Sequence, residues 1–280
     1  MNDQVLTTVT TPLGEVAVTA RVCPACGADD GSPSRYSRPP WTIKACAPCG
    51  FVYVDPAPDT AALAETFAWE RSTKVEEGRR AAAQPVTRGL SKATRFRLHL
   101  LPRYSAHALV HAHAEPGPVL DLGCGEGQAL LALDPAYTPY GIEISAVLAA
   151  TAQDTFRARG GDALHASAVD GLGAFPDGFF TAATLRAYLE HEREPKKLLK
   201  ELKRVLKERG IAVVKVPNYG SLNRRVMGDE WCGFRLPEHL NYFTPGSLRR
   251  LAGDCGYECR FGFAGALPTS DNMWAVLRKA

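Results

Sequence analysis

The sequence lacks any apolar run long enough to span a bilayer. Its first residues, 1–5, lack the charged-then-apolar pattern of a secretory signal. It also lacks a strong charge imbalance, because 33 Lys and Arg against 30 Asp and Glu leave a net charge of +3. That charge is too small to indicate a nucleic-acid partner. We therefore expect a cytoplasmic protein without a membrane partner, whose eight cysteines are thiols or metal ligands and not disulfides.

Four of the cysteines form two matched pairs near the N-terminus. Two residues separate Cys23 from Cys26 and Cys46 from Cys49, and nineteen residues lie between the pairs. This spacing is typical of zinc sites, in which each pair brings two thiolates to one ion. A redox pair or buried free thiols would account less well for two matched pairs. Because four thiolates fill the tetrahedral coordination of zinc, the site is predicted to be structural and not catalytic.

A glycine-rich turn follows an apolar run at 119–127, Val-Leu-Asp-Leu-Gly-Cys-Gly-Glu-Gly. The pattern predicts a buried strand, a turn that lets the backbone approach a ligand, and a helix from Gln128. Asp121 precedes the turn, where it could meet a cationic group. Glu143 ends a second predicted strand about 20 residues further on, where a carboxylate can accept both hydroxyls of a ribose. A plain αβ turn is the alternative to a ligand-binding loop.

These segments resemble the first two motifs of class I S-adenosylmethionine-dependent methyltransferases, the second being Tyr-Gly-Ile-Glu-Ile at 140–144. The likeness extends through 188–191, 195–217 and 237–245, and so covers most of the chain from Pro118. It is greatest to the branch with an amino-terminal zinc ribbon, whose members often act on sugars and other small natural products. The resemblance implies an α/β, Rossmann-like, seven-stranded sheet whose last strand runs antiparallel.

We expect three units: a zinc ribbon at 1–58, a helical linker or lid at 59–114, and the methyltransferase domain at 115–280. Alternating valine and threonine at 4–20 indicate a hairpin. Aromatic side chains of the linker could cover the cofactor or pack the ribbon against the catalytic domain. They include Phe67, Trp69, Phe96 and Tyr104. Predicted strands lie near 118–122, 139–144, 162–167, 179–185, 210–216, 258–264 and 273–278, and predicted helices near 128–133, 146–159, 195–208 and 245–255.

The resemblance also implies a set of residues that bind S-adenosylmethionine. An acidic residue often contacts adenine where this chain has Ser167, so adenine recognition is expected to depend more on backbone groups and Ala168. Arg186 could pair with the methionine carboxylate or an anionic substrate, or pack against a nearby glutamate. The predicted cofactor residues are Asp121, Gly123, Cys124, Gly125, Gly127, Glu143, Ile144, Ser167, Ala168, Leu185 and Arg186.

The long loop after Pro217 is rich in aromatic residues and follows a strand at the sheet's carboxyl edge. We expect the segment 231–244 to wall a substrate pocket. If the acceptor is a hydroxyl, a base must remove its proton, and His239, His191 and, less favoured, Tyr242 are the candidates. His239 could instead only brace its loop. The lysines of 193–209 could form a phosphate track, but leucines at helical spacing favour a solvated helix face.

The sequence therefore predicts methyl transfer from S-adenosylmethionine to a small molecule, such as a sugar or natural-product intermediate, by O- or N-methylation. One alternative is an RNA base methyltransferase that grips RNA with its ribbon. Acidic residues near the ribbon offset the basic ones there, which disfavours that reading. A second alternative is a scaffold that binds the cofactor without catalysis. The acceptor atom, the substrate and the oligomeric state stay open.

Overall fold

The computed structural model describes residues 7–11, 14–59 and 104–280. Most of the expected linker at 59–114, with Phe67, Trp69 and Phe96, lies outside the described residues. Its last part forms helix α4. No helix among the described residues is long and apolar enough to cross a membrane.

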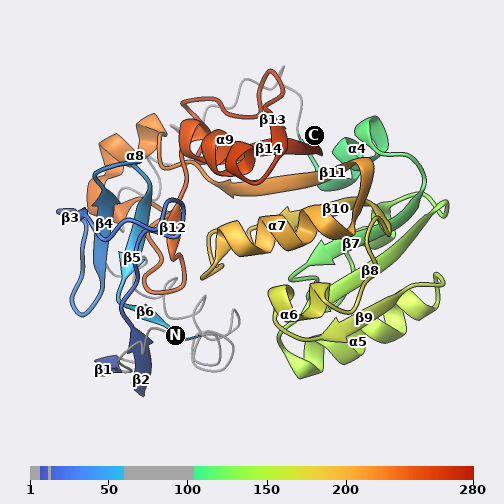
Figure 1. Ribbon diagram of the computed structural model, residues 1–280, viewed down its shortest axis with the longest axis horizontal. Coiled ribbons are helices and arrows are strands. Elements are labelled where there is room, and N and C mark those ends of the chain that lie inside the picture. The colour runs from blue at the N-terminus through green and yellow to red at the C-terminus, as the bar shows by residue number, and fades with distance from the viewer. Residues whose placement is uncertain (1–6, 12–13, 60–103) are drawn as a thin grey trace, which may run out of the picture.

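The larger part of the molecule is a seven-stranded sheet of the order β13-β14-β11-β10-β7-β8-β9 (Figure 1). The five strands from β11 to β9 run parallel, whereas β14 is antiparallel to both of its neighbours. The predicted Rossmann-like methyltransferase sheet is therefore confirmed. Its strands are β7 (Gly117–Leu122), β8 (Tyr137–Glu143), β9 (Asp162–His165), β10 (Phe180–Arg186), β11 (Leu206–Pro217), β13 (Tyr257–Arg260) and β14 (Asn272–Lys279).

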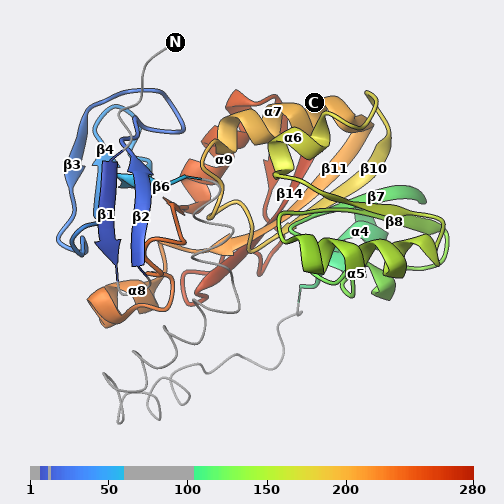
Figure 2. The same ribbon diagram turned by 90° about the horizontal axis from the view of Figure 1, so that it is seen from below.

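Helices cover both faces of this sheet, with α6 and α7 on one side and α4 and α5 on the other (Figure 2). Successive residues of a strand point to opposite faces. Accordingly Leu120 packs with the leucines of α6 and α7, while its neighbour Val119 packs with Phe156 of α5 and Leu109 of α4. The α-helices within the described residues are α4 (Ala106–His113), α5 (Ala146–Arg157), α6 (Ala168–Leu172), α7 (Pro195–Val205), α8 (Leu222–Met227) and α9 (Pro245–Asp254).

The helix expected from Gln128 does not form. Turns follow the glycine-rich loop, and then a single 3₁₀ turn, η1 (Leu130–Ala132). Gly127 has a positive φ of 82°, which no right-handed helix contains. Pro135 also disfavours the helical conformation at the residue before it, so any helix after Gly127 is confined to residues 128–133.

The N-terminal unit contains two small sheets. The predicted hairpin is seen as β1 (Thr7–Thr11) and β2 (Gly14–Thr19), which pair antiparallel, and β2 also pairs with β6 (Ala57–Pro58). The ribbon sheet has the order β12-β5-β4-β3. Its strands are β3 (Gly31–Pro33), β4 (Thr42–Cys46), β5 (Val52–Asp55) and β12 (Asn241–Tyr242). Strand β12 comes from the far end of the chain, so the ribbon sheet is completed by residues of the catalytic part.

The aromatic loop residues expected to wall the pocket are part of the ribbon's core instead. Trp231, Phe234 and Tyr242 are at most 2% exposed and pack with Ile43 and Val54 of the ribbon. Within this cluster the rings of Trp231 and Phe234 pack edge to face, with centroids 5.3 Å apart. The expectation from the sequence failed because aromatic side chains become buried against any accessible apolar surface, and the ribbon's sheet has such a surface.

We expect Trp231→Ala to lower the free energy of unfolding by about 3–5 kcal/mol, because it removes a fully buried ring. It also removes the hydrogen bond of 2.7 Å that Nε1 donates to Asp271 Oδ1. Phe263, 86% exposed, is the matched control, and its alanine variant should be nearly neutral. Denaturant unfolding measures both variants. Equal stability of the two would contradict this packing.

Candidate functional site

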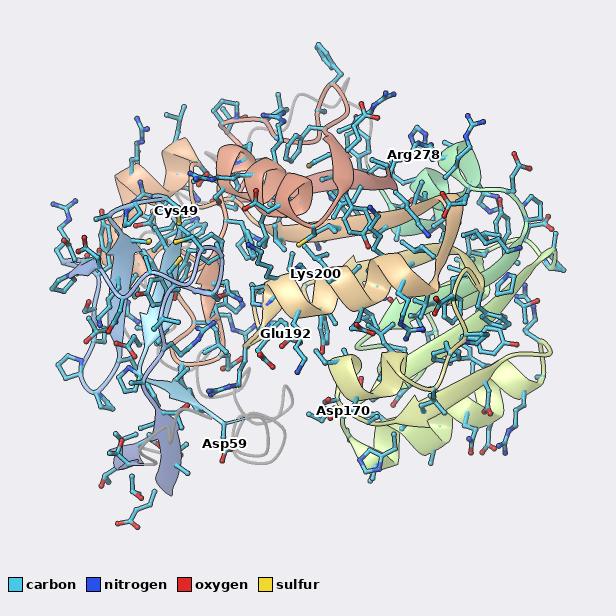
Figure 3. The ribbon with its side chains drawn as sticks, in the orientation of Figure 1. Cys49, Asp59, Asp170, Glu192, Lys200 and Arg278 are labelled. Carbon is cyan, nitrogen blue, oxygen red and sulfur yellow. The ribbon has the colours of Figure 1, made fainter. Side chains whose placement is uncertain are left out.

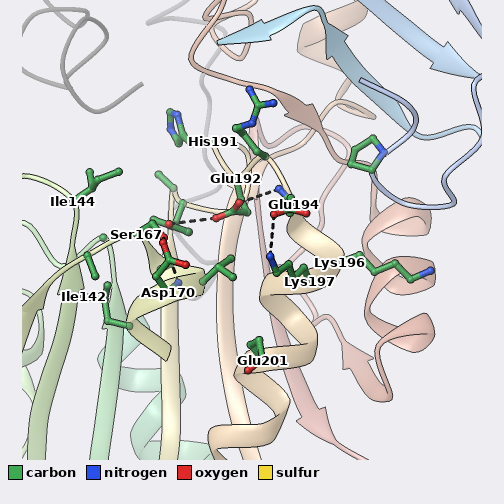
Figure 4. Close-up of a pocket in the computed structure, with 18 of the residues that line it drawn as sticks. Ile142, Ile144, Ser167, Asp170, His191, Glu192, Glu194, Lys196, Lys197 and Glu201 are labelled. Carbon is green, nitrogen blue, oxygen red and sulfur yellow. Dashed lines mark hydrogen bonds and ion pairs between the residues drawn. The ribbon is translucent and has the colours of Figure 1, made fainter. Parts of the chain in front are cut away.

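One cavity of about 1370 Å³ lies between the ribbon and the carboxyl edge of the large sheet. Its lining comes from the glycine-rich loop, the ends of β8 and β10, the start of α6, the first turns of α7 and the ribbon segment 21–27. Figure 4 shows Ser167 and Asp170 on the α6 side and Glu192 and Glu194 at the start of α7. Ligands of open α/β sheets bind beyond the carboxyl ends of the strands, which is where this cavity lies.

The glycine-rich loop presents open backbone to the cavity. Gly125 has a positive φ of 55°, and a Cβ built there would meet none of the described atoms within 4 Å. Glu143 fixes the loop, because its Oε2 accepts from the Gly125 N–H at 2.9 Å and its Oε1 accepts from the Ser145 N–H at 2.9 Å. Each carboxylate oxygen keeps a second lone pair. The site therefore offers empty space beside an oriented carboxylate, which suits a diol.

Asp121 takes a different role from the one expected. It is 1% exposed, accepts a hydrogen bond from Thr184, and lies 3.5 Å from the Arg186 guanidinium, measured from Oδ2 to Nη2. Burial raises the pKa of Asp121 to about 6, and Arg186 opposes that rise. The carboxyl thus holds Arg186 toward the cavity instead of meeting a cationic ligand itself. Arg186 pairs with Asp121 and not with Glu190 or Glu192, the partners considered from the sequence.

The side of the cavity at β8 and α6 is an apolar slot with a polar edge. Ile144 and Ala168 line it, together with Ser167, whose Oγ donates to Asp170 Oδ2 at 2.6 Å. Asp170 lines the cavity and was not predicted. The pattern Ser-x-x-Asp at 167–170 is a helix-start signature that could have indicated it. Asp170 thus supplies an acidic group three residues after Ser167, the position at which the family often has an acidic residue.

The remaining predicted cofactor residues divide into two groups. Gly123 and Cys124 line the cavity. Gly127 and Leu185 are not among the described residues that line it. Leu185 is fully buried in the core, and Gly127 leaves room for the ring of Phe156, which a Cβ would meet at 2.8 Å.

His191 and His239 lie side by side, with ring centroids 4.8 Å apart. Each ring's Nδ1 lies at hydrogen-bonding distance from a backbone carbonyl, His191 from Glu238 O at 2.9 Å and His239 from Gly233 O at 2.8 Å. A carbonyl only accepts, so both rings carry the proton on Nδ1 and leave Nε2 basic. His191 lines the cavity, whereas His239 is 5% exposed and is not among the described lining residues.

Electrostatics keep His191 neutral. Burial lowers its pKa to about 4, and nearby Arg235 lowers it further. The adjacent Glu190, which the sequence did not single out as functional, is 1% exposed. Burial raises the pKa of Glu190 to about 8, against the opposing effect of Lys215 and Arg235. Glu190 Oε2 has no hydrogen-bond partner among the described residues.

The four paired cysteines converge as predicted. Their Sγ atoms all lie within 4.8 Å of one another, and the Cys23–Cys49 and Cys26–Cys46 sulfur distances are 3.5 Å. Tetrahedral thiolates at 2.3 Å from zinc are about 3.8 Å apart, so the cluster fits that ion. Figure 3 shows sulfur atoms gathered beside Cys49. Cys23 and Cys26 also line the cavity, which places the metal site at its wall.

A family model described as "Methyltransferase domain" matches residues 92–260, more than half of the chain. The chain belongs to this methyltransferase family. No curated protein matches the chain. Among solved structures it is similar to an S-adenosylmethionine-dependent methyltransferase of Methanosarcina mazei, with 20% identity, a TM-score of 0.47, and coverage of 64% of this chain and 99% of that one.

Two further solved structures are similar to this methyltransferase. A possible histamine N-methyltransferase of Thermotoga maritima shows 20% identity and a TM-score of 0.46, over 61% of this chain and 86% of that one. A putative O-methyltransferase of Nostoc punctiforme shows 18% identity and a TM-score of 0.48, over 62% and 55%.

The site of this methyltransferase fits S-adenosylmethionine, which supplies an electrophilic methyl group when bound. Glu143 would accept the two ribose hydroxyls, and the open space over Gly125 would admit the chain between ribose and methionine. The slot at Ile144 and Ala168 would take the adenine ring. Arg186, directed by Asp121, would meet the methionine carboxylate.

We expect Glu143→Ala to weaken S-adenosylhomocysteine binding by about 1.5–3 kcal/mol, the range for hydrogen bonds to a charged group. Calorimetry measures this affinity. Asp154→Ala, which removes an exposed acid from neighbouring α5, should leave it unchanged. Unchanged affinity in the Glu143 variant would refute the ribose assignment.

We expect one zinc per chain, held by Cys23, Cys26, Cys46 and Cys49. Cys26→Ser should release the ion and unfold the ribbon, because zinc binding here contributes folding free energy. Cys232→Ser, at a cysteine outside the cluster, should keep the full metal content. Metal analysis of purified protein decides the question, and zinc-free protein, or four thiols all reactive without a chelator, would disprove the site.

Glu190 should make the protein less stable as pH rises. Its folded pKa, about 8, exceeds the ordinary 4.5, so the folded state binds more protons between these values and stability falls with increasing pH. Glu190→Gln removes this loss, and the stability of the variant relative to wild type should increase from about pH 5 to about pH 8. Urea unfolding at both pH values measures it. A constant difference across the range would show that Glu190 ionises normally.

Proposed function

We propose that the enzyme transfers the methyl group of S-adenosylmethionine to an oxygen or nitrogen of a small molecule, such as a sugar or natural-product intermediate. The observation that carries this proposal is one cavity that runs from the glycine-rich loop to His191 and is lined on its far side by the ribbon segment 21–27. Cofactor and acceptor would therefore share one space. Holding two reactants in that way can lower the barrier by several kcal/mol.

The paired histidines suit the removal of a proton from the acceptor. Methyl transfer from a sulfonium is an in-line displacement, and a hydroxyl acceptor loses its proton as the new bond forms. His191 lines the cavity in its neutral form, with His239 in contact behind the same ring. His239 remains the proposed base, with its ring fixed by the Gly233 carbonyl. Because His191 lines the cavity and His239 is not among the described lining residues, the acceptor would reach His239 past the His191 ring. Tyr242, 2% exposed in the ribbon's core, is the weakest of the three candidates.

The lysines at the start of α7 line the cavity, but they are not evidence for an anionic acceptor. Leu198, Leu199, Leu202 and Val205 are buried, which matches the expected amphipathic helix. Lys197 lies 3.4 Å from Glu194, and Lys196 lies 3.9 Å from Asp254. Both charges are therefore partly balanced within the protein.

The position of the ribbon disfavours the RNA alternative. The first cysteine knuckle, residues 22–27, lines the cavity, so this part of the ribbon faces the proposed cofactor site. A ribbon that grips RNA needs an exposed basic surface with stacking side chains. Binding of RNA that weakens with added salt would favour that alternative.

We expect His239→Ala to lower turnover by ~10²-fold or more for a hydroxyl acceptor, while the affinity for S-adenosylhomocysteine stays near that of wild type. A screen of sugars and amines with methyl-labelled S-adenosylmethionine supplies the acceptor for this assay. For an amine the loss should be smaller, because His239 would then only orient the substrate.

The control is His107→Ala, which removes an exposed histidine of α4 and should leave turnover unchanged. Thermal stability measured on the same preparations separates catalysis from bracing of the loop. A stably folded His239 variant with full turnover would end the catalytic assignment.

A further inference from the structure

Arg21 is a buried arginine, 6% exposed, whose guanidinium contacts four acceptors and no carboxylate among the described side chains. Its Nη1 donates to Val54 O at 3.2 Å and to Leu240 O at 3.3 Å. Its Nη2 donates to Arg193 O at 2.8 Å and to Asn241 Oδ1 at 3.2 Å. The planar fork of an arginine carries five N–H donors in a fixed geometry, so one side chain can bond several fixed acceptors at once.

Three of these four acceptors belong to the segments that carry the two histidines. Leu240 and Asn241 directly follow His239. Arg193 lies two residues after His191, in the loop between β10 and α7. One side chain thus holds both histidine-bearing segments from the same side, and its bond to the β5 carbonyl attaches them to the ribbon.

The two segments are also joined to each other. Glu190 O accepts from the N–H groups of Leu240 at 2.7 Å and Asn241 at 3.0 Å. Asn241 Nδ2 donates to Leu189 O at 3.1 Å and to Glu192 O at 2.6 Å. The spacing of the histidine rings therefore depends on one compact hydrogen-bond network. Arg21 joins this network to the N-terminal unit, beside the β12–β5 pairing and the bonds of Arg193 to Thr19, Ala57 and Pro58.

On the ribbon side, Arg21 is close to the metal site. It lies two residues before Cys23, and its own N–H donates to Asp55 Oδ1 at 2.7 Å. Zinc at the cysteine cluster would fix Cys23 and therefore the chain direction at Arg21, since such knuckles take their structure from the metal. Arg21 and the knuckle line the same cavity as His191.

We propose that Arg21 is a positioning residue through which the zinc-loaded ribbon sets the spacing of His191 and His239. This role rests on the proposed function, because it matters to the reaction only if the two histidines act in it. Beside the β12–β5 pairing, zinc then affects the site through the hydrogen bonds of the Arg21 guanidinium, while the glycine-rich loop and Glu143 keep their own contacts. Loss of zinc or of Arg21 should disturb the histidine segments and leave cofactor binding unchanged.

Hydrogen exchange tests this coupling without an acceptor. The wild type and Arg21→Met are each compared with zinc bound and after chelation, following the amides of 188–193 and 238–242. In the wild type, chelation should speed their exchange about 10-fold or more, the effect of losing hydrogen bonds to a charged group. In Arg21→Met these amides should exchange fast with zinc still bound, and chelation should add little.

Histidine ring NMR supplies a readout that general destabilisation does not move. Both rings should report a proton on Nδ1 in the zinc-loaded wild type, and Arg21→Met should mix the two tautomers. Metal analysis should still give one zinc per chain for that variant, and calorimetry should give an unchanged affinity for S-adenosylhomocysteine. Arg204→Met is the matched control. Arg204 also donates to two backbone carbonyls, those of Leu172 and Phe175, but neither belongs to the ribbon or to the histidine segments.

If Arg21→Met fails to fold, Asn241→Ala takes its place in the comparison, because it removes one of the four Arg21 hydrogen bonds together with the amide bonds to Leu189 and Glu192. The proposal is overturned if chelation leaves the exchange rates of both segments unchanged in the wild type. It is also overturned if chelation speeds exchange in Arg21→Met as much as it does in the wild type. Because exchange needs no turnover, this result is independent of the His239→Ala assay. A failed proton-transfer assignment with intact coupling would leave Arg21 as the connection between ribbon and histidines.

Discussion

The antiparallel pairing of β12 with β5 is the interaction on which the rest of the architecture depends. It consists of two residue pairs, Asn241 with Tyr53 and Tyr242 with Val52. Through it a strand near the end of the chain completes the sheet of a ribbon at the beginning. The ribbon is thereby held over the carboxyl edge of the large sheet, where its segment 21–27 forms one wall of the cavity. Both histidines belong to segments fixed by this pairing.

Burial of polar groups is the second constraint. Asp121 and Glu190 are each 1% exposed, and burial raises both pKa values. Asp121 is compensated by Thr184 and Arg186. Glu190 keeps an oxygen without a hydrogen bond among the described residues, beside two histidines. Burial of a carboxyl group without full hydrogen bonding costs stability. It is found at functional sites, where burial shifts the pKa of a group and so sets its protonation state.

Local patterns allowed much of this structure to be predicted. Strands of the large sheet are apolar runs between turn residues, and the zinc cluster follows from cysteine spacing, because both signals lie within a few residues. Glu143 was found in the same way, and it does hold the glycine-rich loop. The contacts of Trp231 and Tyr242 depend on a pairing between strands almost two hundred residues apart in the sequence. The local periodicity of apolar residues carries no information about such a pairing. The pairing of Asp121 with Arg186 was not predicted, because the arginine comes from a neighbouring strand.

The central claim is that the ribbon closes the cofactor site into one reaction cavity. A crystal structure of the zinc-loaded protein with S-adenosylhomocysteine tests it most directly. The account predicts the ribose on Glu143, the adenine beside Ile144 and Asp170, and the sulfur directed to the side of the cavity where His191 lies, with residues 22–27 opposite. A ligand bound elsewhere, or a ribbon turned away from the bound ligand, would contradict it.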